Sequence, residues 1–244
     1  MHTLLLTALL LAAPSPQEPK ENAKELEVLF IGNSFTQYNE LPWMVLSMAR
    51  ADGIAMRYEQ VTSGGYTLEH HWAAGKGEAI AKIASRKWTY VVLQEHSTRP
   101  LDEPAKLAEF ARLFDAKIKA AGAKTLLVVT WPKKDAPENQ AKLNKAYATV
   151  AKELGATLVP VGPAWERAQK ERPSVELYDP DGHHPSPFGS YLTALVLHQV
   201  LHGKPAQSPP KQIALMGSVL VDFEATDAGP ALDLIPFFQK IAAH

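Results

Sequence analysis

The chain has 244 residues and contains no cysteine, which removes several chemistries at once. Disulfide bonds, a thiol nucleophile, thiolate metal sites and a lipidated cysteine anchor all need a cysteine sulfur. An excess of charge of one sign is also missing, because 25 lysines and arginines are balanced by 26 aspartates and glutamates. Without a long basic or acidic block, the composition does not favour nucleic acid or an anionic membrane surface as a partner.

Long apolar runs are scarce, and the clearest one lies at the N-terminus. Residues 4–13 are all apolar or small, and Pro14, Ser15 and Pro16 follow directly. The run is shorter than the roughly 20 residues that a helix needs to cross a bilayer. It predicts a signal peptide and tether over residues 1–19 and a protein exported to the periplasm or the extracellular space. A buried N-terminal helix is the alternative, and no membrane span is expected in the mature chain.

Repeats of 20–50 residues and internal linkers are missing too, so we expect one domain over residues 26–244. Within it, short apolar runs alternate with helical patterns. Strands are predicted near residues 26–31, 56–61, 88–93, 125–131 and 157–161, and helices near 41–51, 107–121, 143–154, 192–201, 212–221 and 231–242. Most of the strand candidates show no strict alternation, as expected for strands covered on both faces. The pattern predicts a three-layer α/β/α, flavodoxin-like fold with a five-stranded parallel sheet.

Two short segments combine residue types that suit acyl transfer. The apolar run of the strand predicted at residues 26–31 is followed by Gly32 and Asn33, so Ser34 is expected where a buried strand meets a helix N-terminus. Far along the chain, Asp181 and His184 lie three residues apart. Serine, histidine and aspartate supply a nucleophile, a base and an orienting acid. Two alternatives stay open: Ser34 could be only a helix N-cap, and Asp181 only a turn residue, with Asp179 as the next candidate acid.

These segments resemble motifs of the SGNH hydrolases, also called GDSL-like esterases. The resemblance rests on Gly-Asn-Ser at 32–34, Ser-Gly-Gly-Tyr-Thr at 63–67 and Asp-Gly-His-His-Pro at 181–185, in that order. It implies that Ser34 attacks an ester, His184 removes its proton and Asp181 orients His184. It also implies that the backbone N–H groups of Ser34 and Gly65 bind the oxyanion. No Gly-x-Ser-x-Gly segment is present, which disfavours the rival α/β-hydrolase fold.

The third motif of that family is altered in this chain. The family has Gly-x-Asn-Asp, whose asparagine donates to the oxyanion, whereas residues 92–97 read Val-Leu-Gln-Glu-His-Ser. The amide of Gln94 is the predicted substitute, which would make it the third oxyanion donor beside Ser34 and Gly65. The alternative is a structural Gln94 that bonds backbone at the sheet end.

The expected rim of the site is polar and aromatic. Glu95, His96 and Trp131 are predicted substrate contacts, with ordinary packing residues as the alternative. Histidines near carboxylates raise the possibility of a metal, but the adjacent His70 and His71 would point apart on a helix, so we expect no metal and no cofactor. The sequence predicts a secreted serine esterase that removes acetyl or another short acyl group from a small-molecule or polysaccharide ester. A non-catalytic carbohydrate-binding protein of the same fold is the alternative.

Overall fold

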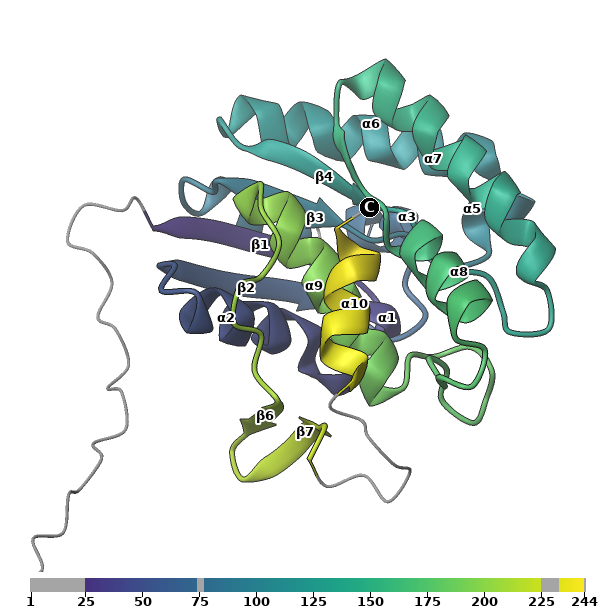
Figure 1. Ribbon diagram of the computed structural model, residues 1–244. Coiled ribbons are helices and arrows are strands. Elements are labelled where there is room, and N and C mark those ends of the chain that lie inside the picture. The colour runs from purple at the N-terminus through teal and green to yellow at the C-terminus, as the bar shows by residue number, and fades with distance from the viewer. Residues whose placement is uncertain (1–24, 74–76, 225–232, 244) are drawn as a thin grey trace, which may run out of the picture.

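The computed structural model describes residues 25–73, 77–224 and 233–243. A parallel five-stranded sheet lies at its centre, in the order β2-β1-β3-β4-β5 (Figure 1). Its strands are β1 (Leu26–Gly32), β2 (Met56–Thr62), β3 (Tyr90–Leu93), β4 (Lys124–Val128) and β5 (Thr157–Val159). The predicted five-stranded parallel sheet is therefore confirmed. The predicted signal peptide and tether, residues 1–19, lie outside the described residues.

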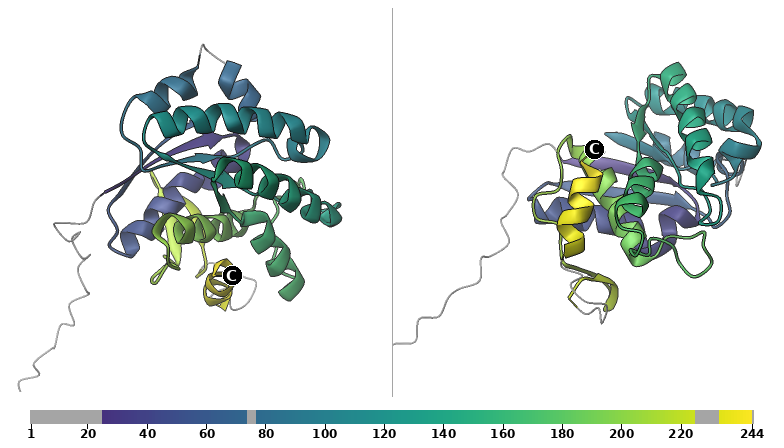
Figure 2. Two further views of the ribbon diagram at one scale, coloured as in Figure 1. Left: turned by 90° about the horizontal axis from the view of Figure 1, so that it is seen from above. Right: turned by 45° about the vertical axis from the view of Figure 1, so that its right-hand side comes forward.

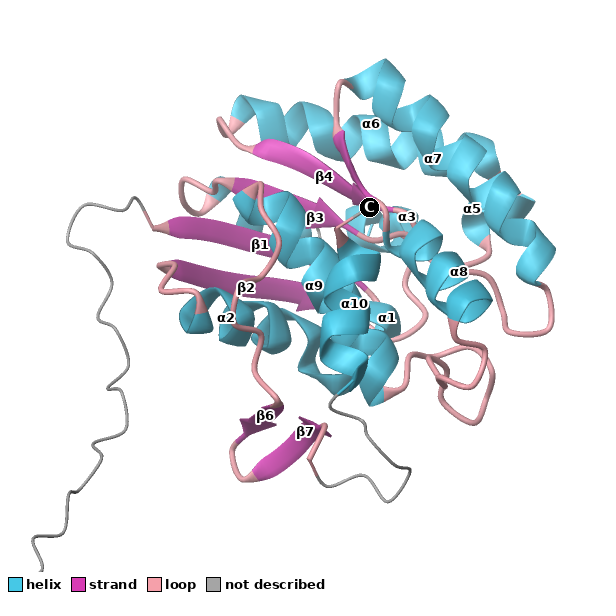
Figure 3. Cartoon of the chain, viewed as in Figure 1, coloured by secondary structure: helices cyan, strands magenta, loops and turns pink. Residues whose placement is uncertain are grey.

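Helices cover both faces of the sheet (Figures 1 and 3), and the view from above shows the three layers (Figure 2, left). One face is covered by α2 (Leu41–Ala51), α8 (Val161–Glu171), α9 (Pro187–His202) and α10 (Leu234–Ala242). The other is covered by α3 (Leu68–Ala73), α4 (Glu78–Ala84), α6 (Pro104–Ala120) and α7 (Gln140–Leu154). Short helical turns connect these layers: α1 (Ser34–Gln37), η1 (Tyr38–Glu40), α5 (Arg99–Asp102) and η3 (Pro137–Asn139).

The central strand shows why its sequence lacks polar alternation. Along β1, Val28 and Phe30 pack into one apolar cluster, whereas Leu29 and Ile31 pack into the other. All four side chains are buried, because neighbouring residues of a strand point to opposite faces and both faces carry helices. Residues 28–31 thus lie at the centre of two cores, and the polar residues Asn33 and Ser34 follow directly after the strand.

The structure corrects one predicted element. Residues 212–221, predicted as a helix, form an antiparallel hairpin of β6 (Gln212–Leu215) and β7 (Ser218–Asp222). Its two-residue turn consists of Met216 (φ 49°) and Gly217 (φ 84°), the pair of positive φ values that matches the twist of a tight hairpin. Ile213 and Val221 pair across the hairpin and are buried against the α9 layer. A helix would have directed these side chains differently.

Parallel strands bring their carboxyl ends to one edge of the sheet, which is where ligands bind in open α/β folds. The segments that follow β1, β2, β3 and β4 all leave at this edge, and the segment between α8 and α9 reaches it as well: the Trp131 indole N–H after β4 donates to the backbone oxygen of His183. The edge therefore assembles the motifs at residues 32–34, 63–67, 94–97 and 181–185.

Candidate active site

Ser34 is the first residue of α1, directly after the central strand. The N-cap of α1 is Asn33, whose side-chain Oδ1 accepts the Phe35 N–H at 3.1 Å. The alternative that Ser34 serves as the N-cap is therefore wrong. Because Asn33 satisfies the helix end, the Ser34 hydroxyl is left to interact with side chains from elsewhere in the chain.

Ser34, His184 and Asp181 form a continuous hydrogen-bonded chain. The Ser34 Oγ lies 3.0 Å from His184 Nε2, and His184 Nδ1 lies 2.5 Å from Asp181 Oδ2. The other carboxylate oxygen, Oδ1, accepts the backbone N–H groups of His183 (2.8 Å) and His184 (2.9 Å). The hydrogen bond from His184, followed by those two N–H groups, lowers the pKa of Asp181 to about 2. Asp181 is therefore a carboxylate at neutral pH and holds Nδ1–H of the imidazole, which leaves Nε2 to accept the serine proton.

The imidazole of His184 is fixed by packing as well. The Tyr38 ring stacks on it, with centroids 4.2 Å apart and planes 8° from parallel. Asn39, next in the chain, donates from Nδ2 to the backbone oxygen of Pro185 (3.0 Å) and to the Ser190 hydroxyl (2.9 Å). The segment after Ser34 therefore holds the histidine segment directly. Sequence reasoning missed Tyr38 and Asn39; the one usable signal is that asparagine tolerates the positive φ seen here, 52°.

The glycine turn lies beside the nucleophile turn. The Tyr66 N–H donates to the Ser63 oxygen at 3.1 Å, which closes a tight turn in which Gly65 has a φ of +73°. Asn33 joins the two turns, because its Nδ2 donates to the Tyr66 backbone oxygen at 2.8 Å. Gly65 itself is exposed, and Ser34 is partly exposed.

Gln94 occupies a different place from the one predicted for an oxyanion donor. Its side chain is only 3% exposed, and its Oε1 accepts both the Asn33 N–H and the Thr36 hydroxyl, each at 2.9 Å. Its Nε2 donates to the Glu95 backbone oxygen at 2.6 Å. These contacts agree with the alternative of a structural Gln94 that supports the nucleophile turn from below. Gly32 leaves room for it, since a Cβ there would lie 2.6 Å from Gln94 Oε1.

We expect Gln94→Ala to act mainly on stability. Removing the amide leaves the Asn33 N–H and the Thr36 hydroxyl without a partner in a buried place, which costs about 1–3 kcal/mol for each group left unsatisfied. Urea unfolding should show this loss, and Gln37→Ala, which removes an exposed amide, should not. A hundredfold lower kcat with an unchanged unfolding midpoint would instead restore Gln94 as the oxyanion donor.

Two of the three predicted substrate contacts are buried. Trp131 is 2% exposed and lies between the rings of Phe35 (4.3 Å) and Trp165 (4.1 Å), and Glu95 is 1% exposed. The burial of Glu95 agrees with the alternative of a packing residue. Trp131 also lines a cavity of about 240 Å³ with Ser97 and Thr98, so its role as a substrate contact stays a prediction. The aromatic stack supports the floor of the site, and the Trp131 indole N–H donates to the His183 backbone oxygen.

His96, the third predicted contact, is half-buried and lines an open cleft of about 580 Å³. The cleft reaches the proposed triad, because Asp181 is among its lining residues, as is the neighbouring His183. The remaining lining residues are Ser97, Thr98, Lys133, Lys134, Asp135, Pro180 and Gly182. Burial lowers the pKa of His96 and of His183, so both imidazoles are neutral at physiological pH. The side chains that line the cleft therefore carry hydroxyl, imidazole, ammonium and carboxylate groups.

Two further properties concern the described part of the chain alone. Among residues 25–73, 77–224 and 233–243, no group of three or more histidines and carboxylates is arranged to hold a metal ion. None of the helices in these same ranges combines the length and the apolar character that crossing a bilayer requires.

Comparison with solved structures places this architecture in a family. A protein from Slackia heliotrinireducens that is described as an SGNH hydrolase is 30% identical, with a TM-score of 0.62 over 72% of this chain and 98% of that one. At that identity and coverage, the chain belongs to the SGNH hydrolases.

More distant similarities concern the fold alone. A DUF4886 family protein from Bacteroides uniformis is 20% identical, with a TM-score of 0.64 over 90% of this chain and 92% of that one. An acetyl xylan esterase from Geobacillus stearothermophilus is 14% identical, with a TM-score of 0.55 over 76% of this chain and 99% of that one. No family model and no curated protein matches the sequence.

Proposed function

We propose that the protein is a secreted ester hydrolase in which Ser34 is the nucleophile, His184 the general base and Asp181 the acid that orients it. The observation that supports this most strongly is the unbroken hydrogen-bonded chain from the Ser34 Oγ through the imidazole to the Asp181 carboxylate. These three groups come from opposite ends of the chain, so local turn chemistry alone does not account for their alignment. Membership of a hydrolase family adds to the argument.

The geometry gives each group a step. Ser34 Oγ attacks the ester carbonyl carbon while His184 Nε2 takes its proton, and the Asp181 carboxylate stabilises the imidazolium that forms. The backbone N–H groups of Ser34 and Gly65 bind the oxyanion. The imidazolium then gives its proton to the leaving alcohol, which departs and leaves an acyl group on Ser34. Water attacks that acyl-enzyme with His184 as base, which releases the acid and restores the serine.

We further propose a substrate with a polar alcohol part and a short acyl group, such as an acetylated carbohydrate. The cleft beside the triad is lined by hydroxyl, imidazole and charged side chains that hydrogen-bond a hydrated substrate. A smaller cavity of about 230 Å³ beside Gly65 also has polar side chains in its lining, with Thr67, Thr98 and Arg99 among them. In the part of the chain that the structure describes, neither of these two cavities has leucine, isoleucine, valine or aromatic ring side chains of the kind that line the groove for a long acyl chain, apart from the imidazoles of His96 and His183. One structural neighbour is an acetyl xylan esterase, which agrees with this proposal at the level of the fold.

Chain-length selectivity tests the substrate class. With p-nitrophenyl esters of two to twelve carbons, we expect kcat/KM to be highest at two to four carbons, because further methylene groups find no apolar surface that would remove them from water. Acetylated xylo-oligosaccharides should be deacetylated, as followed by acetate release. A rate that rises with chain length would contradict the proposal and indicate a lipase. Binding of acetylated sugar without turnover would support the non-catalytic carbohydrate-binding alternative.

Export is part of the same proposal and has its own test. Expression of the full chain in a bacterium should yield a mature protein that starts after the apolar run of residues 4–13, in the periplasm or the medium. N-terminal mass analysis of the recovered protein identifies the cleavage site. Retention of the whole chain in the cytosol would contradict export and would leave the chemistry of Ser34 untouched.

A further inference from the structure

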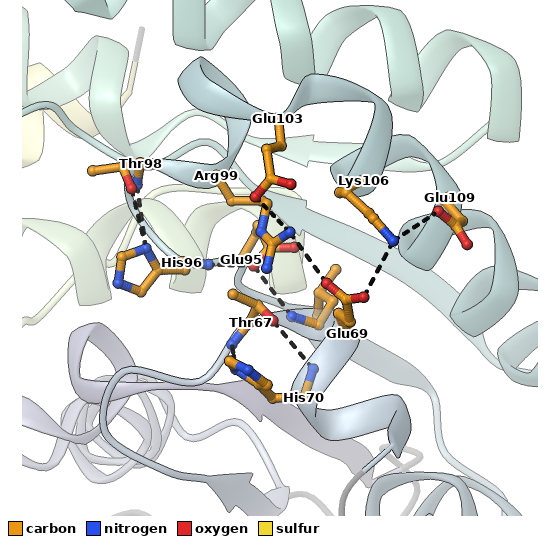
Figure 4. A network of polar contacts seen from close by, with 11 residues as sticks. Thr67, Glu69, His70, Glu95, His96, Thr98, Arg99, Glu103, Lys106 and Glu109 are labelled. Carbon is orange, nitrogen blue, oxygen red and sulfur yellow. Dashed lines mark hydrogen bonds and ion pairs between the residues drawn. The ribbon is translucent and has the colours of Figure 1, made fainter.

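A buried carboxyl group lies behind the proposed oxyanion hole, and the catalytic steps above do not use it. Glu95 follows Gln94 after the end of β3, and its side chain is 1% exposed. Its Oε1 accepts two backbone N–H groups, from His96 at 2.6 Å and from Leu68 at 3.1 Å (Figure 4). Burial of a carboxyl group costs free energy unless hydrogen bonds such as these compensate for the lost water. A buried glutamate at this position therefore suggests a specific role.

The two donors belong to different parts of the site. Leu68 is the first residue of α3 and comes directly after the glycine turn of residues 63–67. His96 belongs to the segment after β3 that lines the cleft. Through one oxygen, Glu95 thus joins the exit of the glycine turn to the segment beside it. No other side chain shown in Figure 4 bonds the backbone of both segments.

The exit of the glycine turn is itself closed tightly. The Thr67 N–H donates to His70 Nδ1 at 3.2 Å, and the His70 N–H donates to the Thr67 hydroxyl at 3.1 Å (Figure 4). This reciprocal pair makes the start of α3 a stiff unit. A displacement of the Leu68 N–H would therefore move the preceding residues with it, and Gly65 lies only three positions earlier. Asn33 bonds the Tyr66 backbone oxygen, and Glu95 bonds the Leu68 N–H. These two contacts hold the glycine turn in position relative to the ends of β1 and β3.

The charges that face Glu95 come from three neighbouring helices. Arg99 of α5 is the nearest cation, but its guanidinium pairs with Glu69 of α3 (3.2 Å) and with Glu103 (2.8 Å). The negative charge of Glu69 repels the Glu95 carboxylate. Burial raises the pKa of the phenol of Tyr147 in α7, and the negative charge of Glu95 raises it further. Burial outweighs the two N–H bonds and the shared Arg99, and it raises the pKa of Glu95 to about 7.

We propose that Glu95 is a positioning residue, which holds the glycine turn against the segment after β3 and so places the Gly65 N–H for the oxyanion. This inference rests on the proposed ester hydrolysis at Ser34. It also offers a reason why the usual asparagine of the third motif can be absent. Gln94 bonds the backbone of the nucleophile turn, and Glu95 bonds the backbone at the exit of the glycine turn. The two backbone donors are then held firmly, and this compensates for the third donor that is lost.

Three variants test the proposal. Glu95→Ala removes the shared acceptor and should lower kcat roughly tenfold to a hundredfold with little change in KM, because only transition-state contacts are misplaced. Glu95→Gln keeps an Oε1 that accepts both N–H groups and should stay within about threefold of wild type. Glu69→Gln, which changes a carboxylate of the same network that bonds Arg99 and Lys106, is the matched control and should have near-normal kcat.

Inhibition by a small alkylboronic acid separates positioning from general damage. Its tetrahedral adduct on Ser34 places an oxygen in the oxyanion hole, so Glu95→Ala should weaken its Ki by the same factor as kcat/KM. Unchanged kcat and Ki in Glu95→Ala, or a loss of thermal stability alone, would overturn the proposal. Absence of turnover and of boronate inhibition in the wild type would instead disprove the ester hydrolase itself.

If Glu95→Ala does not fold, pH-dependent stability of Glu95→Gln still decides the matter. The unfolded carboxyl titrates near its ordinary 4.5, whereas burial raises the folded pKa to about 7, so the folded state binds more protons between these values. The unfolding free energy of the wild type should therefore fall relative to Glu95→Gln as the pH rises from about 4.5 to about 7. A constant difference, together with a Glu95→Gln variant that loses activity tenfold or more, would contradict the proposal.

Discussion

Replacement of Ser34 by alanine is expected to lower kcat by at least about a thousandfold and to leave the fold intact. The Ser34 hydroxyl contacts the imidazole of His184, whereas Asn33 provides the helix cap, so the local structure does not depend on the hydroxyl. The backbone N–H of residue 34 remains available to the oxyanion, and a weak residual rate should survive. Initial rates with p-nitrophenyl acetate and the midpoint of thermal unfolding measure the two parts of this expectation.

Ser47→Ala is the matched control for this substitution. Ser47 is a partly buried helical serine whose hydroxyl donates to the Trp43 oxygen within α2, away from the carboxyl edge of the sheet. Its loss should leave kcat within about twofold, since surface and helix serines of this kind seldom matter by more than a few tenths of a kcal/mol. A Ser34→Ala variant that kept more than about a tenth of the wild-type rate would exclude Ser34 as the nucleophile.

The second large effect is expected at Asp181. Asp181→Asn should lower kcat roughly a thousandfold to ten-thousandfold, because an amide N–H₂ opposite Nδ1 favours the wrong tautomer of His184 and no longer stabilises the imidazolium. The substituted side chain still offers Oδ1 to the N–H groups of His183 and His184, so the turn itself should be preserved. Steady-state kinetics and circular dichroism of the variant test this expectation.

Asp179 supplies the comparison that decides between the two candidate acids. In the structure only its backbone reaches the site: its N–H donates to the His184 oxygen, and its oxygen accepts the Gly182 N–H. Asp179→Asn should therefore stay within about threefold of wild type. Equal losses of kcat in Asp179→Asn and Asp181→Asn would contradict the assignment of Asp181 as the acid that orients His184. The low pKa of Asp181, about 2, also implies that its carboxylate does not titrate across the working range above pH 4.

Most of the fold could be predicted from hydrophobic patterning. Short apolar runs that end in glycine or polar turns marked the five parallel strands, and helical spacing marked most of the covering helices. The hairpin at residues 212–222 was the failure. Its apolar residues fit helical and strand spacing about equally well over so short a stretch, and the deciding feature is a methionine with positive φ at Met216, which a sequence does not reveal.

The site divides in the same way. Ser34, Asp181 and His184 could be selected as candidates because their residue types suit acyl transfer, and the structure brings them into one chain of contacts. Gly65 could be selected only through the resemblance of residues 63–67 to a family motif. The particular backbone groups that Gln94 and Glu95 bond could not be predicted, because these groups lie far away in sequence.

Gln94 bonds Asn33, which lies 61 positions earlier, and Glu95 bonds Leu68, 27 positions earlier. At the end of a strand the alternation of side chains gives no further guidance on which one points inward. The packing of Trp131 could not be predicted for a related reason: a tryptophan at a strand end suits a substrate platform and a buried stack equally well, and the structure alone shows its ring against Trp165.

Labelling with a fluorophosphonate tests whether Ser34 is an activated nucleophile, since the reagent phosphonylates only a serine that a neighbouring base activates. The full-length protein would be incubated with the reagent, digested and analysed by mass spectrometry. We expect one phosphonyl group per chain, on the peptide that contains Ser34, with no label in Ser34→Ala and much slower labelling in Asp181→Asn. Label on another serine, or ester turnover by a protein whose Ser34 stays unmodified, would contradict that role of Ser34.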